Sequence, residues 1–202
     1  MKLYFSPGAC SMAPHIVLRE ARFTFDLEKV DLAKKQTESG EDFNKINPKG
    51  YVPAIRLEDG QILTEAAVIL QCLADKKPEA GLAPKPETME RYRLMEWLNF
   101  VASELHKQIG PLFNPKVTGE WKESQLDLLG KRFDYLSERL SGRQYLMGDQ
   151  FTVADAYLFT VLNWTHYLKL DLGKWPALRD YMVRVAARPA VKETMKAEGL
   201  IK

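Results

Sequence analysis

A proline-rich stretch, PEAGLAPKPE at residues 78–87, divides the sequence into two halves with different patterns. It holds three prolines and one glycine in ten residues, a composition typical of a linker between domains. Strand-like and helix-like runs alternate before it, whereas only helical patterns follow it. We therefore predict a first domain over residues 1–78, a linker over 79–87 and a second domain over 88–202.

The first half follows the order strand, helix, strand, loop, hairpin, helix. The expected elements are strands at 2–5 and 25–32, a helix at 11–22 with Ser11 as its N-cap, a hairpin at 52–63 and a helix at 64–77. The hairpin is the clearest of these, because the Asp59-Gly60 pair is a strong tight-turn signal. A βαβ unit joined to a ββα unit predicts a small thioredoxin-like α/β domain.

The second half is expected to be all-α. Helices are predicted at 88–109, 123–140, 152–170 and 175–189, and Gly110-Pro111 is expected to end the first of them. Thr152 and Asp155 form a Thr-x-x-Asp capping signal. The helix that follows is apolar nearly all round, which places it at the centre of the helical domain.

Composition excludes several classes of function. Twenty-nine basic against 27 acidic residues give a net charge of +2, so there is no electrostatic argument for nucleic acid or an anionic membrane as partner. No apolar run approaches the roughly 20 residues of a spanning helix. Two cysteines do not make a disulfide framework, which favours a reducing, cytoplasmic setting. No His, Cys, Asp or Glu spacing suggests a metal site, so no metal is expected.

Cys10, in the turn PGAC before the first predicted helix, is the first candidate for chemistry. The positive end of a helix dipole favours thiolate. Ala13 stands where a Cys-x-x-Cys motif would have its second thiol, so any chemistry here uses one protein thiol. A buried structural cysteine explains the position equally well. Cys72 is expected to pack in the core.

Two other places carry polar groups at informative spacing. Asn99, Ser103 and His106 follow one another at four and three residues, which gives one polar stripe on a helix; a solvated helix face is the alternative. Val52-Pro53 marks an unusual strand edge that can pair with a peptide-like ligand or is simply blunted by proline. Glu65, in the first turn of a helix, either favours the helix dipole or offers its carboxylate to a ligand ammonium.

These pieces together resemble the glutathione S-transferase family, most closely its bacterial beta class. The resemblance is carried by Pro-Gly-Ala-Cys at 7–10, Asn-Pro-Lys-Gly-x-Val-Pro at 47–53, Leu-Thr-Glu at 63–65, Trp-Leu-Asn-Phe at 97–100, Ser-Glu-Leu-His-Lys at 103–107 and Phe-Thr-Val-Ala-Asp-Ala-Tyr at 151–157. It covers essentially the whole chain. It implies the cytosolic glutathione transferase fold, with a thioredoxin-like N-terminal domain, an all-helical C-terminal domain, glutathione as co-substrate and a homodimer.

The resemblance also implies residue roles. Cys10 and His106 would approach the glutathione sulfur, and Cys10 can form a mixed disulfide with it. Lys35 would pair with the glycyl carboxylate, and backbone groups of Val52, held by a cis Pro53, would bond the cysteinyl part. Glu65 and the N–H of Ala66 would hold the γ-glutamyl end. The remaining site residues would be Asn99, Ser103 and Glu104, some of them across a dimer interface.

The implied activity is attack of the glutathione thiolate on a small hydrophobic electrophile in an apolar cleft between the domains, lined by side chains such as Phe113, Trp164 and Tyr167. Thiol-disulfide exchange through Cys10 is a second possibility at the same site. A non-enzymatic binding or interaction module of the same fold is the alternative. Ala66 departs from the family, because many members have serine there. Tyr4 and Ser11 are further candidates for activating the thiol.

Overall fold

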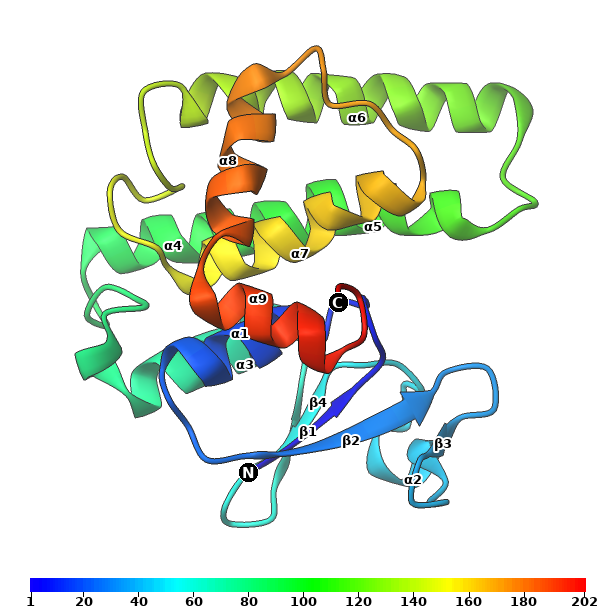
Figure 1. Cartoon of the computed structure of the whole chain (residues 1–202), viewed down its shortest axis with the longest axis vertical. Helices are drawn as coiled ribbons and strands as arrows, with labels where there is room; N and C mark the ends of the chain where they lie inside the picture. The colour runs from blue at the N-terminus through cyan, green and yellow to red at the C-terminus, as the bar shows by residue number, and fades with distance from the viewer. The chain divides into compact units, whose positions relative to one another are not determined.

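The computed structural model describes residues 1–202 and divides into two compact units (Figure 1). The sheet unit comprises Met1–Ala83 and Arg188–Lys202, and the helical unit comprises Pro84–Ala187. The boundaries expected from the sequence placed residues 188–202 in the helical domain. They lie instead in the sheet unit, because α9 (Pro189–Ala197) packs along α1 (Met12–Glu20).

The sheet unit contains a mixed five-stranded sheet in the order β3-β2-β1-β4-β5. The strands are β1 (Lys2–Phe5), β2 (Asp26–Asp31), β3 (Gln36–Thr37), β4 (Ala54–Arg56) and β5 (Ile62–Thr64). β1 pairs parallel with β2 and antiparallel with β4, and β4 pairs antiparallel with β5. The predicted βαβ unit and hairpin are therefore confirmed. The short β3 and the helix α2 (Phe43–Ile46) lie in the segment expected to be a loop.

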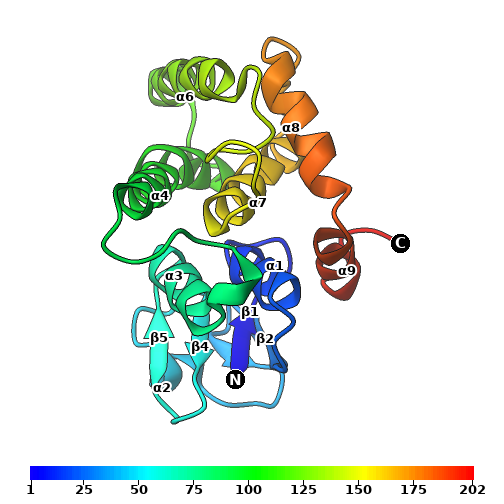
Figure 2. The same cartoon turned by 90° about the vertical axis from the view of Figure 1, so that its left-hand side faces the viewer.

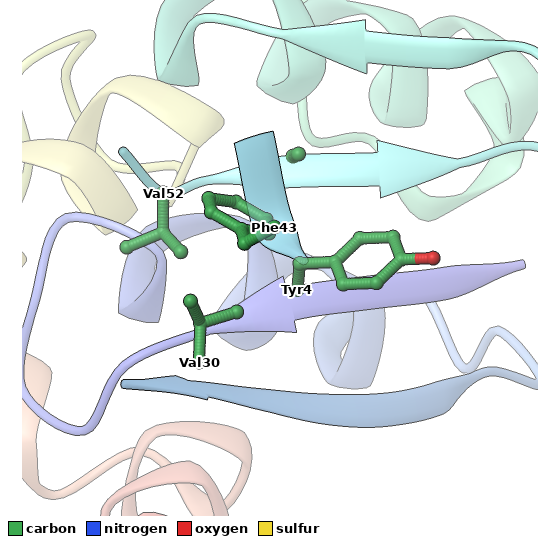
Figure 3. Close-up of a cluster of buried hydrophobic side chains, with 5 residues drawn as sticks. Tyr4, Val30, Phe43 and Val52 are labelled. Carbon is green, nitrogen blue, oxygen red and sulfur yellow. The ribbon is translucent and has the colours of Figure 1, made fainter. Parts of the chain in front are cut away.

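The central strand β1 is buried on both faces, which defines two cores. Side chains alternate along a strand, so Leu3 and Phe5 face one side and Tyr4 the other. Tyr4 joins Val30, Phe43, Val52 and Ala54 in the cluster of buried side chains beneath α2 (Figure 3). On the other face, the ring of Phe5 lies 6.0 Å from the ring of His15 on α1.

Helices α1, α3 (Ala66–Lys76) and α9 complete the sheet unit, together with the 3₁₀ turn η1 (Pro78–Ala80). α1 contacts both α3 and α9, as Figure 2 shows. Arg188 binds both carboxylate oxygens of Glu20, at 2.6 and 2.9 Å, which fastens the start of α9 to the end of α1. Ser11 does not cap α1 as expected, since its hydroxyl bonds instead to the backbone of Ser6.

The helical unit consists of helices only. Its elements are α4 (Met89–Phe100), the π-helix η2 (Val101–His106), α5 (Lys107–Ile109), the 3₁₀ helix η3 (Gly110–Phe113), α6 (Gly119–Leu140), α7 (Val153–Tyr167) and α8 (Pro176–Ala186). Nearly every residue of α7 is buried, which confirms its predicted central place. The single helix expected over 88–109 is interrupted by the π-helix, and the helical path continues past Gly110 as η3. No helix of the structure has the length and apolar character needed to cross a membrane.

A buried carboxylate organises the start of α7. Asp155 is fully buried, and its side chain accepts hydrogen bonds from the backbone N–H groups of Leu146 and Thr152, both at 2.9 Å, and from the Tyr181 hydroxyl at 3.2 Å. The bond to Thr152 confirms the capping signal. Burial raises the pKa of Asp155 to about 6, although these hydrogen bonds act in the opposite direction. One carboxylate thus ties α7 to the preceding loop and to α8.

We expect Asp155→Ala to lower the free energy of unfolding by about 3 kcal/mol or more, because it leaves several buried donors without an acceptor, at about 1–3 kcal/mol each. Urea unfolding followed by circular dichroism measures the change. Asp149→Ala, at an exposed aspartate in the same loop, is the matched control and should change the free energy of unfolding by less than about 0.5 kcal/mol. Equal effects of the two substitutions would contradict the prediction.

Candidate functional site

Cys10 lies in the loop Ser6–Ser11, which connects the end of β1 to the start of α1. Its side chain is half-buried, and its Sγ donates a hydrogen bond to the carbonyl oxygen of Val52 at 3.1 Å. Turn-type backbone bonds shape the loop: Ala9 N–H donates to Ser6 O and Met12 N–H donates to Ala9 O. The position two residues before α1 places the thiol near the positive end of the helix dipole.

Val52 holds the partner of this thiol in place. Its side chain is 2% exposed and packs with Val30 and Phe43, which lie beside it in Figure 3. The Val52–Pro53 peptide bond is cis, and β4 begins at the next residue. Because the side chain is anchored in the core, the backbone oxygen of Val52 has a fixed position just before β4. The strand edge expected here is not an edge of the sheet, because β4 pairs with both β1 and β5.

Glu65 lies immediately before α3, with a φ of +70°. Its carboxylate accepts hydrogen bonds from the Lys49 ammonium and, at 2.8 Å, from the Tyr51 hydroxyl. The bond from Tyr51 to Glu65 raises the pKa of that phenol. Ala66, the first residue of α3, is nearly buried, and its short side chain offers no hydroxyl.

Lys35 reaches the same stretch of chain from the segment between β2 and β3. It has a φ of +55°, and its ammonium donates to the carbonyl oxygen of Gly50 at 2.7 Å. A Cβ at Gly50 would meet the Lys35 side chain at 3.5 Å and Asn44 Oδ1 at 3.1 Å. Glycine at this position therefore permits the close approach of Lys35.

The four consecutive residues Lys49–Val52, called here the connecting segment, bring the predicted residues of the sheet unit together. Lys35 contacts Gly50, Glu65 contacts Lys49 and Tyr51, and Cys10 contacts Val52. Asn47 supports the segment, since its amide donates to Tyr51 O at 2.6 Å. Neither Lys49 nor Tyr51 was predicted as a site residue. Lys49 lies within the motif at 47–53, and its charge could have been assigned to a charged group of a ligand, as the carboxylate of Glu65 was.

The candidate residues of the helical unit do not form the single polar stripe that was expected. Asn99 and Ser103 are exposed, and the Ser103 hydroxyl donates to Asn99 O at 2.9 Å. Glu104 pairs with Arg132 at 2.7 Å. These positions straddle the start of the π-helix, whose wider turns shift the α-helical spacing on which the stripe was based.

His106 turns toward the core of the helical unit. Its Nδ1 lies 2.7 Å from the Tyr157 hydroxyl, and its ring meets that of Trp164 edge-on at 4.8 Å. Phe113 lies 6.0 Å from Trp164, ring to ring. Phe113 and Tyr167 are both about half exposed, at 48% and 46%. Tyr157 was not predicted as the partner of His106, because the two residues are 51 positions apart.

The other residues discussed from the sequence do not take part in the contacts described above. Tyr4 is buried and its hydroxyl accepts from Arg56, and Ser11 is buried against Ser6. Cys72 is half-buried rather than in the core, and this partial burial raises its pKa. His15, which had no partner recognisable in the sequence, is fully buried with its Nδ1 2.8 Å from Glu198. No group of three or more His, Cys, Asp and Glu side chains is placed to share a metal ion.

A thioredoxin-like unit with a thiol after its first strand and a cis-proline before β4, together with an all-helical unit, is typical of the two-domain class of glutathione-binding proteins. Family models agree: the N-terminal domain model of glutathione S-transferase matches residues 8–76, and the C-terminal domain model matches residues 100–189.

Known proteins are similar over the full length. Glutathione S-transferase GstA of Escherichia coli O157:H7 is 46% identical over 99% of this chain and 100% of its own. A sphingomonad glutathione S-transferase complexed with glutathione has a TM-score of 0.95 at 46% identity, covering all of both chains. A bacterial beta class glutathione S-transferase of Sphingomonas chungbukensis gives the same TM-score, identity and coverage. The chain belongs to the glutathione S-transferase family.

Glu65→Gln is expected to lower the pKa of Tyr51 toward its ordinary value near 10, because the carboxylate that accepts the phenol hydrogen bond is replaced by a neutral amide. NMR titration of ring-labelled tyrosine, with Tyr51 assigned by Tyr51→Phe, measures the shift. Asp59→Asn, which neutralises an exposed carboxylate bonded to Gln61, is the control and should leave Tyr51 unchanged. A Tyr51 pKa that is the same in wild type and Glu65→Gln would contradict the prediction.

Proposed function

We propose that the protein is a glutathione transferase that conjugates the glutathione thiolate to small hydrophobic electrophiles. The observation that carries the proposal is the connecting segment Lys49–Val52, which contacts Cys10, Lys35 and Glu65. A cationic, an anionic and a sulfur-bearing side chain around a short stretch of backbone suit a peptide with two carboxylates, an ammonium and a thiol. The structural relative complexed with glutathione supports the same ligand.

The sheet unit is assigned the tripeptide. Lys35 pairs with the glycyl carboxylate. The backbone of Val52, which lies before β4 and outside its strand pairing, bonds the cysteinyl part. Glu65 takes the γ-glutamyl ammonium, a role that its present contact with the Lys49 ammonium supports. The N–H of Ala66, at the start of α3, takes the γ-glutamyl carboxylate. Because residue 66 is alanine, the γ-glutamyl carboxylate receives a hydrogen bond from the backbone N–H of residue 66 and none from a side-chain hydroxyl.

The helical unit is assigned the electrophile. The partly exposed aromatic rings of Phe113 and Tyr167, with Trp164 between Phe113 and His106, supply apolar surface. His106 is proposed to act on the glutathione sulfur, held by Tyr157 through its Nδ1. Asn99, Ser103 and Glu104 are proposed as further glutathione-binding residues, some of them acting across a homodimer interface. The protein is proposed to act in the cytoplasm, because its two unpaired cysteines favour a reducing setting.

The reaction needs a thiolate near neutral pH. Hydrogen bonds to the sulfur and the positive end of α1 favour the deprotonated form of the bound glutathione. The thiolate then attacks the electrophilic carbon and forms a carbon–sulfur bond. The bond from that carbon to its leaving group breaks, and the leaving group departs with the electron pair.

We expect Lys35→Met to raise the Kd for glutathione at least about tenfold, because a charge-assisted contact to a carboxylate is worth about 1.5–3 kcal/mol. Isothermal titration calorimetry measures the affinity. Lys34→Met is the matched control, since Lys34 is exposed and pairs only loosely with Asp31 at 3.7 Å. If folded wild-type protein does not bind glutathione, the proposal is wrong and a non-enzymatic module is favoured. If Lys34→Met weakens binding as much as Lys35→Met, the assignment of Lys35 is wrong.

Thiol-disulfide exchange is a second candidate function, favoured by the thiol of Cys10 opposite the backbone of Val52. The Cys10 thiolate attacks the glutathione sulfur of a mixed disulfide substrate, forming a Cys10–glutathione disulfide and releasing the substrate thiolate. A second glutathione thiolate then attacks this disulfide, which gives oxidised glutathione and restores the Cys10 thiolate. The two functions share the site and differ in which sulfur attacks.

Cys10→Ala separates the two reactions. Disulfide reduction should fall at least a hundredfold because the attacking sulfur is gone, whereas conjugation of a chloronitrobenzene substrate should keep at least a tenth of its kcat/KM. Both rates are measured spectrophotometrically at saturating glutathione. Cys72→Ala is the control and should leave both rates unchanged. Unchanged disulfide reduction in Cys10→Ala would show that Cys10 has no part in exchange.

A further inference from the structure

The carboxylate of Glu198 reaches the loop that carries Cys10, and none of the proposed ligand contacts uses it. Glu198 directly follows α9, and its side chain is completely buried. One oxygen, Oε2, accepts the backbone N–H of Gly8 at 2.8 Å, and the other, Oε1, lies 2.8 Å from His15 Nδ1. Gly8 is two residues before Cys10, so Glu198 links α9 to the loop Ser6–Ser11.

The hydrogen-bond pattern assigns the tautomer of His15. Arg19 donates from its Nε to His15 Nε2 at 3.2 Å, and a guanidinium can only donate. His15 Nε2 is therefore the unprotonated nitrogen, and Nδ1 carries the hydrogen that is donated to Glu198. With this tautomer both oxygens of Glu198 accept a hydrogen bond, one from Gly8 N–H and one from His15 Nδ1–H.

The attachment of α9 to α1 has other supports. Arg188 binds Glu20 through two hydrogen bonds at the start of α9, and Arg19 lies 3.7 Å from Glu193 near its middle. Buried apolar residues of α9 such as Val191 add to this packing. The helix therefore remains in place without Glu198, and the particular contribution of Glu198 is its bond to Gly8.

The loop has a shape that a bond at Gly8 would fix. Gly8 has a φ of +70°, a conformation that L side chains rarely adopt. On either side of it, Ser6 bonds to Ala9 and to the Ser11 hydroxyl. These bonds close the loop on itself, whereas the bond from Gly8 to Glu198 fastens it to a different element. A loop fastened in this way holds Cys10 at a set distance from Val52.

We propose that Glu198, oriented by His15, is a positioning residue that fixes the Gly8–Cys10 backbone and thereby the Cys10 thiol opposite Val52. This inference deepens the proposed function, because a loop held at one edge of the glutathione site preorganises that site. Preorganisation reduces the ordering that a ligand must induce on binding. The anchoring itself is measurable without glutathione.

The test is Glu198→Gln, which keeps the shape of the side chain but can accept only one of the two N–H groups. We expect backbone amide exchange in residues 8–10 to become about tenfold faster. Cys10 should react about three- to tenfold faster with a neutral disulfide reagent, with Cys72 in the same molecule as the internal reference. KM for glutathione should rise about three- to tenfold while kcat stays within twofold. Glu198→Asp, whose carboxylate is too short to reach both partners, should change the same quantities in the same direction.

Glu20→Gln is the matched control, because it weakens the other end of the α9–α1 contact at a residue ten positions from Cys10. It should lower the melting temperature yet leave the three quantities within twofold of wild type. The inference is overturned if Glu198→Gln and Glu198→Asp change only the melting temperature, or if Glu20→Gln changes Cys10 reactivity equally. If the wild type does not bind glutathione, the proposed function fails, but amide exchange and thiol reactivity still decide whether Glu198 anchors the loop.

Discussion

Burial of β1 on both faces is the constraint on which the sheet unit depends. The strand has neighbours on both sides in the sheet, and its alternating side chains serve two separate cores. The face that includes Tyr4 also contains Val52, so the same cluster that buries the strand fixes the backbone that receives the Cys10 thiol. The other face carries α1, whose N-terminal end begins directly after the Cys10 loop. One four-residue strand thus determines where both halves of the thiol contact lie.

The helical unit is organised differently, around one polar group in an otherwise apolar helix. Asp155 receives hydrogen bonds from three separate segments, so the start of α7, the preceding loop and α8 have one relative arrangement. Such a buried carboxylate is costly unless its partners are all present. Apolar packing alone would allow α7 to rotate or slide among similar neighbours, and the requirement to satisfy Asp155 selects one position.

Local patterns accounted for much of the fold and less of the site. The Asp59-Gly60 turn, the alternation at 2–5 and the Thr152 capping signal act within a few residues, so they were readable in the sequence. The boundary at Arg188 was not, because it depends on the pairing of Arg188 with Glu20, 168 residues earlier. For the same reason, Glu198 was not predicted as the partner of His15, nor Tyr157 as the partner of His106.

The polar stripe predicted on residues 99–106 was misplaced because the prediction assumed α-helical turns, and no local residue signals a π-helix there. Roles in glutathione binding came from family resemblance and stay predictions. Cys72 was expected to pack in the core, but it lies half-buried.

The division of the chain has a consequence for the order of its synthesis. The helical unit is an insertion in the sheet unit, because the sheet unit contains residues on both sides of it. Residues 188–202 therefore leave the ribosome after all of Pro84–Ala187. The helical unit can therefore complete its contacts first, as domains generally fold as units during synthesis. Until then the sheet unit lacks α9, His15 lacks its carboxylate and the Cys10 loop lacks one of its anchors. The thiol site is therefore completed only after the helical unit has been synthesised, when α9 joins the sheet unit.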